Sequence, residues 1–147
     1  MSEWLMVYEV QEVDLVKAFH EVTTFSFPMR EEIAVDDLIY IYMKAPFDAI
    51  LYQVTVTDVN RKELPDYERD YYTATYLEGV SQYFTVELLE KYPPDLLTFE
   101  FLENNGLTQL SDFAPLSEEL AYSIEYHEAE AETDEEELVD NSIDEMY

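Results

Sequence analysis

The sequence predicts an α+β domain in which a curled antiparallel β-sheet, a partial barrel, is flanked by helices. Three observations predict it. A strand pattern is followed by a helical pattern, then by several strand patterns, then by two helical patterns. Hydrophobic residues make up 48% of the chain and include 13 Tyr and 8 Phe, which is enough for a packed core. The length of 147 residues suits one domain with a tail.

The chain opens with a strand pattern and a helical pattern. Residues 4–10 (WLMVYEV) are mostly apolar and favour a strand. Residues 14–22 place apolar side chains at the spacing of one helix face, and Asp14 precedes them as a capping residue. A strand followed directly by an amphipathic helix is therefore expected at the N-terminus.

The middle of the chain is predicted to form the sheet. Residues 38–43 (LIYIYM) and 49–59 (AILYQVTVTDV) are rich in β-branched and aromatic residues, and Pro46 between them marks a turn. The second run begins wholly apolar and then alternates, which indicates burial on both faces at first and on one face later.

The second half of the chain is predicted to add two strands and two helices. Residues 70–77 and 82–89 form a second strand pair around Gly79. A helix that Asp95 caps is expected through residue 102, and residues 117–125 predict a last helix.

The net charge of −28 is the most unusual property of the chain. Residues 1–127 hold 25 acidic and seven basic residues, and residues 128–147 hold ten acidic residues and no basic one. We therefore predict an acidic domain over 1–127 and a flexible acidic tail over 128–147. Charge of this size destabilises a compact state through self-repulsion, so it calls for a function. The domain is strongly acidic without the tail, so the tail does not explain the charge.

Composition excludes several classes of function. The absence of cysteine excludes disulfides, thiolate nucleophiles and cysteine-based zinc sites. Two glycines allow no phosphate-binding loop, and no catalytic triad can be recognised in the sequence. We therefore expect a protein without enzymatic activity, cofactor or metal site. No apolar run is long enough to span a membrane and no secretory signal opens the chain, so we expect a cytoplasmic protein. Anionic lipid, DNA and RNA would be repelled.

Several segments between residues 4 and 125 together resemble EVE domains, which belong to the PUA-like superfamily. They are Trp4 in the first strand, the run Asp14-Leu15 with Ala18-Phe19, the segment 33–42 (IAVDDLIYIY), the run from Pro46 to Val56, and the segments 102–107 (LENNGL) and 116–120 (LSEEL). Asp36 stands where the family pattern prefers glycine, and the basic surface typical of the family is missing. The resemblance implies a PUA-like fold.

The resemblance also implies a pocket for a modified base. EVE domains are associated with recognising such a base after it flips into an aromatic-lined pocket. The aromatic residues near the matching positions are Trp4, Tyr8, Phe25, Phe27 and Tyr52. One hypothesis is therefore a module that binds a modified base or another small ligand. The scarcity of basic residues argues against this hypothesis, because a domain that recognises a flipped base must also bind the neighbouring phosphates.

The charge favours a different hypothesis, a non-enzymatic DNA mimic. Duplex DNA carries one charge per ~1.7 Å of its axis, and the charge density of this domain approaches that value. Carboxylates would occupy the DNA-binding cleft of a basic host defence protein, such as a restriction or CRISPR-type effector of a phage's host, since arginine pairs carboxylates and phosphates with similar geometry. The candidate contact residues are Glu31, Glu32, Asp36 and Asp37, then Glu63, Asp66, Glu68 and Asp70, and finally Glu118 and Glu119.

Two other interpretations of the charge stay open. The acidic surface could merely keep the protein soluble or adapt it to salt. Alternatively, the protein could be an adaptor that binds a basic partner mainly through the acidic tail.

Overall fold

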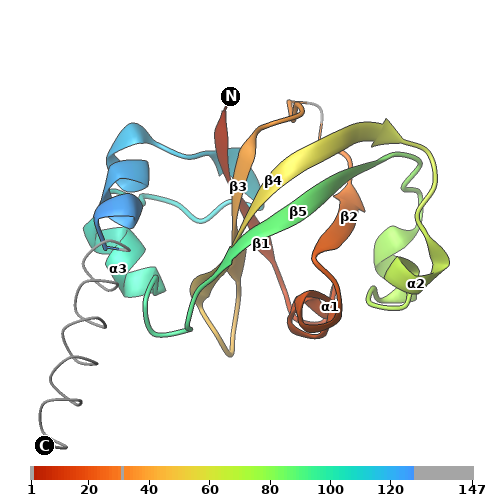
Figure 1. Ribbon diagram of the computed structural model, residues 1–147. Coiled ribbons are helices and arrows are strands. Elements are labelled where there is room, and N and C mark those ends of the chain that lie inside the picture. Colours follow the sequence, from red (N-terminus) through yellow and green to blue (C-terminus); the bar gives the residue numbers. More distant parts are fainter. Residues whose placement is uncertain (1, 31, 128–147) are drawn as a thin grey trace, which may run out of the picture.

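The computed structural model describes residues 2–30 and 32–127, which form a curled, open, six-stranded sheet with helices on both of its faces (Figure 1). The strands are β1 (Glu3–Tyr8), β2 (Thr24–Pro28), β3 (Leu38–Met43), β4 (Ala49–Arg61), β5 (Tyr83–Lys91) and β6 (Phe113–Pro115). The helices are α1 (Leu15–Glu21), α2 (Asp66–Arg69) and α3 (Phe99–Asn104), a 3-10 helix (Ala74–Leu77) and a helical segment at 118–127. This architecture confirms the α+β prediction.

The strand order is β2-β5-β4-β3-β1-β6, and one pair departs from the expected antiparallel arrangement. β1 and β3 run parallel, whereas the other neighbours in the sheet are antiparallel. Parallel neighbours need a crossover connection, and α1 with β2 supplies it by carrying the chain back to the end of the sheet where β1 begins. The sheet is therefore mixed.

Strands β1 and β3 are buried on both faces. In β1, Leu5 and Val7 contact one hydrophobic cluster, while Met6 and Tyr8 contact the other. β3 repeats this division, with two tyrosines facing the α3 side and Ile39, Ile41 and Met43 facing the α1 side. Strands covered on both faces lack polar alternation, which is why these two segments read as continuous apolar runs.

Four of the predicted elements are confirmed with the same or slightly shifted ends. α1 begins after Asp14, whose carboxylate accepts a hydrogen bond from the Lys17 N–H as the capping prediction required. β3 has the predicted bounds, and β4 extends two residues beyond the predicted strand. The predicted strand at 82–89 is β5.

The predicted strand at 70–77 is wrong. The chain there follows α2 with a turn and the 3-10 helix Ala74–Leu77. The tyrosines that suggested a strand instead lie across the sheet: the ring of Tyr72 stacks on that of Phe25 at 5.5 Å and on that of Tyr76 at 5.8 Å. Aromatic residues favour strands only because they fit a half-buried surface, and ring packing satisfies that need equally well here.

The C-terminal helices are present, but the first of them begins later than expected. α3 starts at Phe99 and is capped by Thr98 rather than Asp95. The segment before it forms a turn at 94–96, and the Leu97 carbonyl that follows accepts a hydrogen bond from the Ile50 N–H at 2.9 Å. The helix at 118–127 is capped by the Ser117 hydroxyl. The predicted acidic tail at 128–147 lies outside the described residues.

Among the helices of the described residues, none has the length and hydropathy that crossing a bilayer would require.

Candidate functional site

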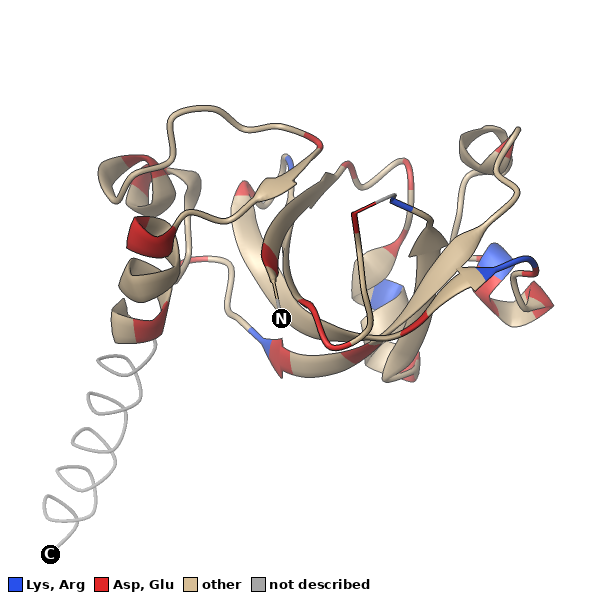
Figure 2. Cartoon of the chain, turned by 90° about the horizontal axis from the view of Figure 1, so that it is seen from above, with Lys and Arg blue, Asp and Glu red and all other residues tan. Residues whose placement is uncertain are grey.

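The candidate phosphate-mimicking acids fall on three separate parts of the surface. The exposed ones are Glu32 and Asp36 between β2 and β3, Glu63, Asp66 and Asp70 around α2, and Glu118 and Glu119 in the last helix. Glu31 lies outside the described residues. Figure 1 places α2 and the last helix (blue) at opposite ends of the molecule. Figure 2 shows acidic residues distributed along the chain with few basic ones between them.

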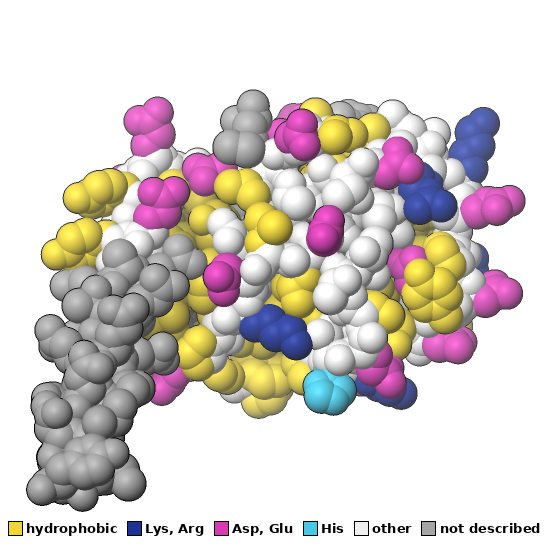
Figure 3. Space-filling model, viewed as in Figure 1, with side chains coloured by type: hydrophobic (Ala, Val, Ile, Leu, Met, Phe, Trp, Pro, Cys, Tyr) yellow, Lys and Arg dark blue, Asp and Glu magenta, His cyan; other side chains and the backbone are white. Residues whose placement is uncertain are grey.

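The acidic side chains do not gather into one patch on the face that Figure 3 shows, where they are scattered among uncharged residues. Within residues 2–30 and 32–127 a single ion pair forms, between Arg61 Nε and Asp58 Oδ2 at 3.8 Å. The acidic surface is therefore almost uncompensated by internal pairing.

Two of the candidate contact residues are buried, which corrects the expectation that they face a partner. Asp37 is 3% exposed, and its carboxylate accepts hydrogen bonds from Ser2 N, Trp4 Nε1 and Ala34 N at 2.9, 2.9 and 3.0 Å. Glu68 is 2% exposed beneath α2. A carboxylate without exposed area cannot replace a DNA phosphate, so both residues serve the fold.

Replacing Glu68 with glutamine should stabilise the domain at pH 7 by about 1 kcal/mol, because a buried charged group without full pairing is costly. Burial raises the pKa of Glu68, against the opposing effect of hydrogen bonding with Ser26 and Tyr67, and its Oε1 has no hydrogen-bond partner among the described residues. The pKa of Glu68 is higher in the folded state than in the unfolded state. Protonated Glu68 therefore stabilises the wild-type fold fully below about pH 4, and this stabilisation is lost as the pH rises through the folded-state pKa.

Urea unfolding at pH 4.5 and pH 7 measures this effect. The wild-type protein should be less stable at pH 7 than at pH 4.5, and this difference should be smaller in Glu68→Gln. Glu63→Gln, an exposed control on the same segment, should show the same difference as the wild type. Equal behaviour of the two variants would contradict the prediction.

The five aromatic residues predicted to line a base pocket all lie in the core. Trp4, Tyr8, Phe25, Phe27 and Tyr52 are 6, 1, 0, 0 and 5% exposed and belong to one cluster of buried residues. The structure does bring them together, but against one another rather than around an open space. A base could stack on them only after the core had opened.

One edge of this cluster keeps unpaired polar atoms. The Tyr8 hydroxyl and Arg30 Nε are buried and make no hydrogen bond of regular geometry to any described residue, although Tyr76 and Arg30 both lie close to the Tyr8 hydroxyl. The Arg30 guanidinium lies 5.5 Å from the ring centre of Phe113, which stacks on Trp4 at 4.7 Å. Burial, followed by the neighbouring Tyr76, raises the pKa of Tyr8 well above its usual range, and Arg30 acts in the opposite direction. Orphaned polar groups of this kind need an explanation.

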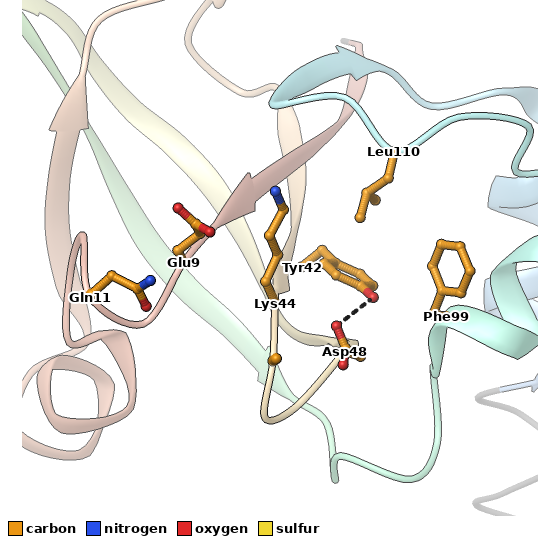
Figure 4. A pocket seen from close by; sticks show the side chains of 8 residues that line it. Glu9, Gln11, Tyr42, Lys44, Asp48, Phe99 and Leu110 are labelled. Carbon is orange, nitrogen blue, oxygen red and sulfur yellow. Dashed lines mark hydrogen bonds between the residues drawn. The ribbon is translucent and has the colours of Figure 1, made fainter.

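A pocket lies on the opposite face of the sheet, at the ends of β1 and β3 (Figure 4). Its volume of about 550 Å³ falls in the range of small-molecule sites. The lining residues are Glu9, Gln11, Tyr42, Lys44, Ala45, Asp48, Phe99 and Leu110. They combine an apolar wall with three charged side chains.

Backbone hydrogen bonds fix the charged and aromatic residues of this pocket. The Phe99 N–H donates to the Asp48 carbonyl at 2.9 Å, which ties the start of α3 to the β3–β4 turn. The Lys44 N–H donates to the Tyr8 carbonyl at 3.0 Å, which holds the end of β3 beside the end of β1. These two hydrogen bonds thus hold Phe99, Asp48 and Lys44 around one pocket, although they come from distant parts of the sequence.

The aromatic side of the pocket contains a tyrosine held in its neutral form. The Tyr42 hydroxyl donates to Asp48 Oδ1 at 3.5 Å. Burial and the adjacent Asp48 carboxylate raise the pKa of Tyr42 to about 12. The hydroxyl therefore stays protonated, and remains a donor, to a higher pH than an ordinary tyrosine. The Tyr42 and Phe99 rings meet edge to face, with centres 6.5 Å apart.

Sequence reasoning missed this pocket. Its residues come from four segments, and Asp48 and Phe99 are far apart in the chain. The one local indication of a site was the presence of two charged residues, Lys44 and Asp48, in the short turn around Pro46. No spacing rule connects them with α3.

Comparison with solved structures identifies the fold. An ASCH protein from Zymomonas mobilis is 13% identical with a TM-score of 0.60, covering 84% of this chain and 93% of that chain. A hypothetical protein from Leishmania major is 14% identical with a TM-score of 0.58, covering 89% and 97%. A protein from Agrobacterium tumefaciens is 10% identical with a TM-score of 0.55, covering 86% and 93%.

No family model matches the sequence, and no curated protein matches it. Identities this low establish the fold alone, and the narrower resemblance to EVE domains stays a prediction. The curled sheet and its structural neighbours, which include an ASCH protein, give the chain a PUA-like fold.

Proposed function

We propose that this protein is a non-enzymatic inhibitor on a PUA-like, EVE-related scaffold that binds a basic, DNA-binding protein by presenting carboxylates in place of DNA phosphates. The observation that carries the proposal is the excess of exposed acids on a folded domain. Residues 1–127 hold 25 acidic and seven basic residues, and one ion pair forms among the described ones. Carboxylates left without internal partners are available to arginine and lysine of another protein.

The proposed target is a DNA-binding host defence protein, such as a nuclease or its recognition subunit, in the cytoplasm of a phage's host. Such clefts already bind a dense array of negative charge, and electrostatic complementarity favours rapid association. The contacts would come from the exposed acids of the three groups, without Asp37 and Glu68. Because they lie on separate parts of the surface, one target need not engage them all.

The test is capture of proteins from a host lysate at moderate salt, repeated with a 30-base-pair duplex as competitor. We expect capture of a DNA-binding protein, displacement by the duplex, and weaker binding as salt increases. Capture that the duplex leaves unchanged would contradict mimicry.

Charge-reversal variants then separate a specific surface from net charge. We expect Glu32→Lys with Asp36→Lys, or Asp66→Lys with Asp70→Lys, to weaken binding at least about tenfold. Glu78→Lys with Glu90→Lys is the matched control, because these exposed acids change the net charge equally but lie outside the three groups. An equal loss in all three variants would indicate only bulk attraction.

The same assay distinguishes the adaptor hypothesis. Removal of residues 128–147 should abolish capture if the acidic tail is the main contact. Under the mimic proposal it should slow association and weaken capture only partly, because the domain keeps its own charge.

A second candidate function is binding of a modified base or another small ligand on the aromatic side of the sheet. The buried, unpaired Tyr8 hydroxyl and Arg30 Nε favour it, since a ligand entering there would find a donor pair beside stacked rings. Saturation-transfer NMR with 5-methyl-2′-deoxycytidine tests it. A signal lost in Tyr8→Phe and Arg30→Met, with folding retained, would support this function.

A further inference from the structure

The pocket beside α3 contains charges of both signs that do not pair with each other. Lys44 supplies an ammonium group, and Glu9 and Asp48 supply carboxylates. None of the three forms an ion pair with any residue in the described part of the chain. In a domain with more than three acids per base, a lysine next to two acids that makes no ion pair is available to a ligand.

The apolar wall of the same pocket is partly exposed to solvent. Phe99 is 38% exposed although it is a large aromatic residue, and its ring meets Tyr42 edge to face. Leu110 closes the wall from the segment before β6. In Figure 4 the Asp48 carboxylate and the Tyr42 hydroxyl lie on the side of Phe99, while the Lys44 ammonium lies nearer to Glu9. The pocket therefore has an aromatic part that holds the Asp48 carboxylate and a second part in which Lys44 lies beside Glu9.

Asp48 combines the backbone conformation that the turn requires with a carboxylate. Its φ of 49° is in the left-handed region, which aspartate adopts more readily than most non-glycine residues. Glycine would also satisfy the turn, but it would remove the carboxylate that accepts the Tyr42 hydroxyl bond.

We propose that this pocket binds a small zwitterion with an apolar side group, of the α-amino-acid class. The ligand's ammonium group would bind Asp48, its carboxylate would bind Lys44, and its side group would pack against Phe99 and Leu110. The inference does not depend on DNA mimicry, because none of these residues belongs to the three acidic groups.

Other ligand classes fit the same residues less well. A nucleotide would bring several negative charges against two carboxylates in a chain of net charge −28. An apolar ligand would desolvate three charged side chains without pairing them. A simple amine would leave Lys44 as a repulsive charge. A zwitterion is the class that uses both signs.

Isothermal titration calorimetry with three compounds of one shape tests the proposal on the full chain. L-phenylalanine carries both charges, 2-phenylethylamine only the ammonium group, and 3-phenylpropionate only the carboxylate. We expect L-phenylalanine to bind at least about tenfold more tightly than either analogue, since each lost charge pair is worth about 1.4 kcal/mol or more.

Variants assign each end of the ligand. Lys44→Met should reduce the affinity for L-phenylalanine to that for the amine, and Asp48→Asn should reduce it to that for the acid. Asparagine also tolerates the left-handed backbone, so the turn is kept. Lys17→Met and Asp95→Asn, matched changes at exposed positions outside the pocket, should leave the affinity unchanged.

Two outcomes would overturn the proposal. Equal binding of 2-phenylethylamine and L-phenylalanine, unaffected by Lys44→Met, would make the pocket a site for organic cations. Absence of binding by all three compounds at millimolar concentration, in a protein with native thermal unfolding, would remove this ligand class from the pocket.

Discussion

Phe27→Ala is expected to lower the free energy of unfolding by about 3–5 kcal/mol, the range typical of deleting a fully buried aromatic side chain. Phe27 is 0% exposed, and its ring contacts those of Tyr8, Phe25 and Phe84 at centre distances of 5.3, 5.3 and 5.7 Å. Its loss would therefore leave a cavity between these three rings. A domain of this size can lose most of its stability from one such change.

Urea unfolding monitored by circular dichroism measures the loss. Phe27→Leu, which keeps most of the volume, should cost about 1.5 kcal/mol or less. Tyr122→Ala removes an aromatic ring that is 69% exposed and should change stability by about 0.5 kcal/mol or less. Near-normal stability of Phe27→Ala would indicate a ring that lines an accessible pocket instead of a packed core.

Asp37→Ala is expected to cost about 3 kcal/mol, because the hydrogen bonds that a carboxylate accepts are among the stronger ones and its removal orphans buried donors. Three donors would lose their acceptor: the main-chain N–H groups of Ser2 and Ala34 and the buried indole of Trp4. The bonds from Ser2 and Trp4 join β1 to the start of β3 across the parallel pair. Asp36→Ala, at an exposed neighbour, is the control for the lost charge.

The contribution of Asp37 should depend on pH in the direction opposite to that of Glu68. Burial alone would raise the pKa of Asp37, but the hydrogen bonds from Ser2, Trp4 and Ala34 outweigh burial and lower it. A lowered folded-state pKa means that the stabilisation is present above the unfolded pKa of about 3.9 and is lost as the pH falls through the folded pKa. The cost of Asp37→Ala should therefore shrink in acid. An unchanged cost between pH 7 and pH 2.5 would contradict this assignment.

Local patterns were sufficient for the elements whose burial is regular. α1, β3 and β4 each carry a complete period of apolar residues with a cap or a turn at one end, and each was predicted within two residues of its ends. The segment 70–77 has the composition of a strand, but β5, its predicted partner, already pairs with β2 on one side and β4 on the other. Its tyrosines pack over β2 instead. Composition indicates that these side chains will be buried, but it does not indicate which part of the protein will cover them.

The acidic residues show the same limit at the level of single side chains. Asp36 and Asp37 are neighbours of identical chemistry, yet Asp36 is exposed with a φ of 78°, and Asp37 is buried under three donors. Nothing local distinguishes them, because the donors come from the chain terminus, from β1 and from the preceding turn. The predicted contact set therefore mixed surface carboxylates with structural ones.

The sequence by itself determined the α+β class, most of the strands and helices, and the unusual charge, since each depends on composition or on the period of neighbouring residues. Only the tertiary structure decided the parallel pairing of β1 with β3, the burial of Asp37 and Glu68, and the pocket that joins Asp48 to Phe99. These features arise from contacts between segments far apart in the chain. Such contacts form when several elements share one core, and no local pattern encodes which residues will meet there.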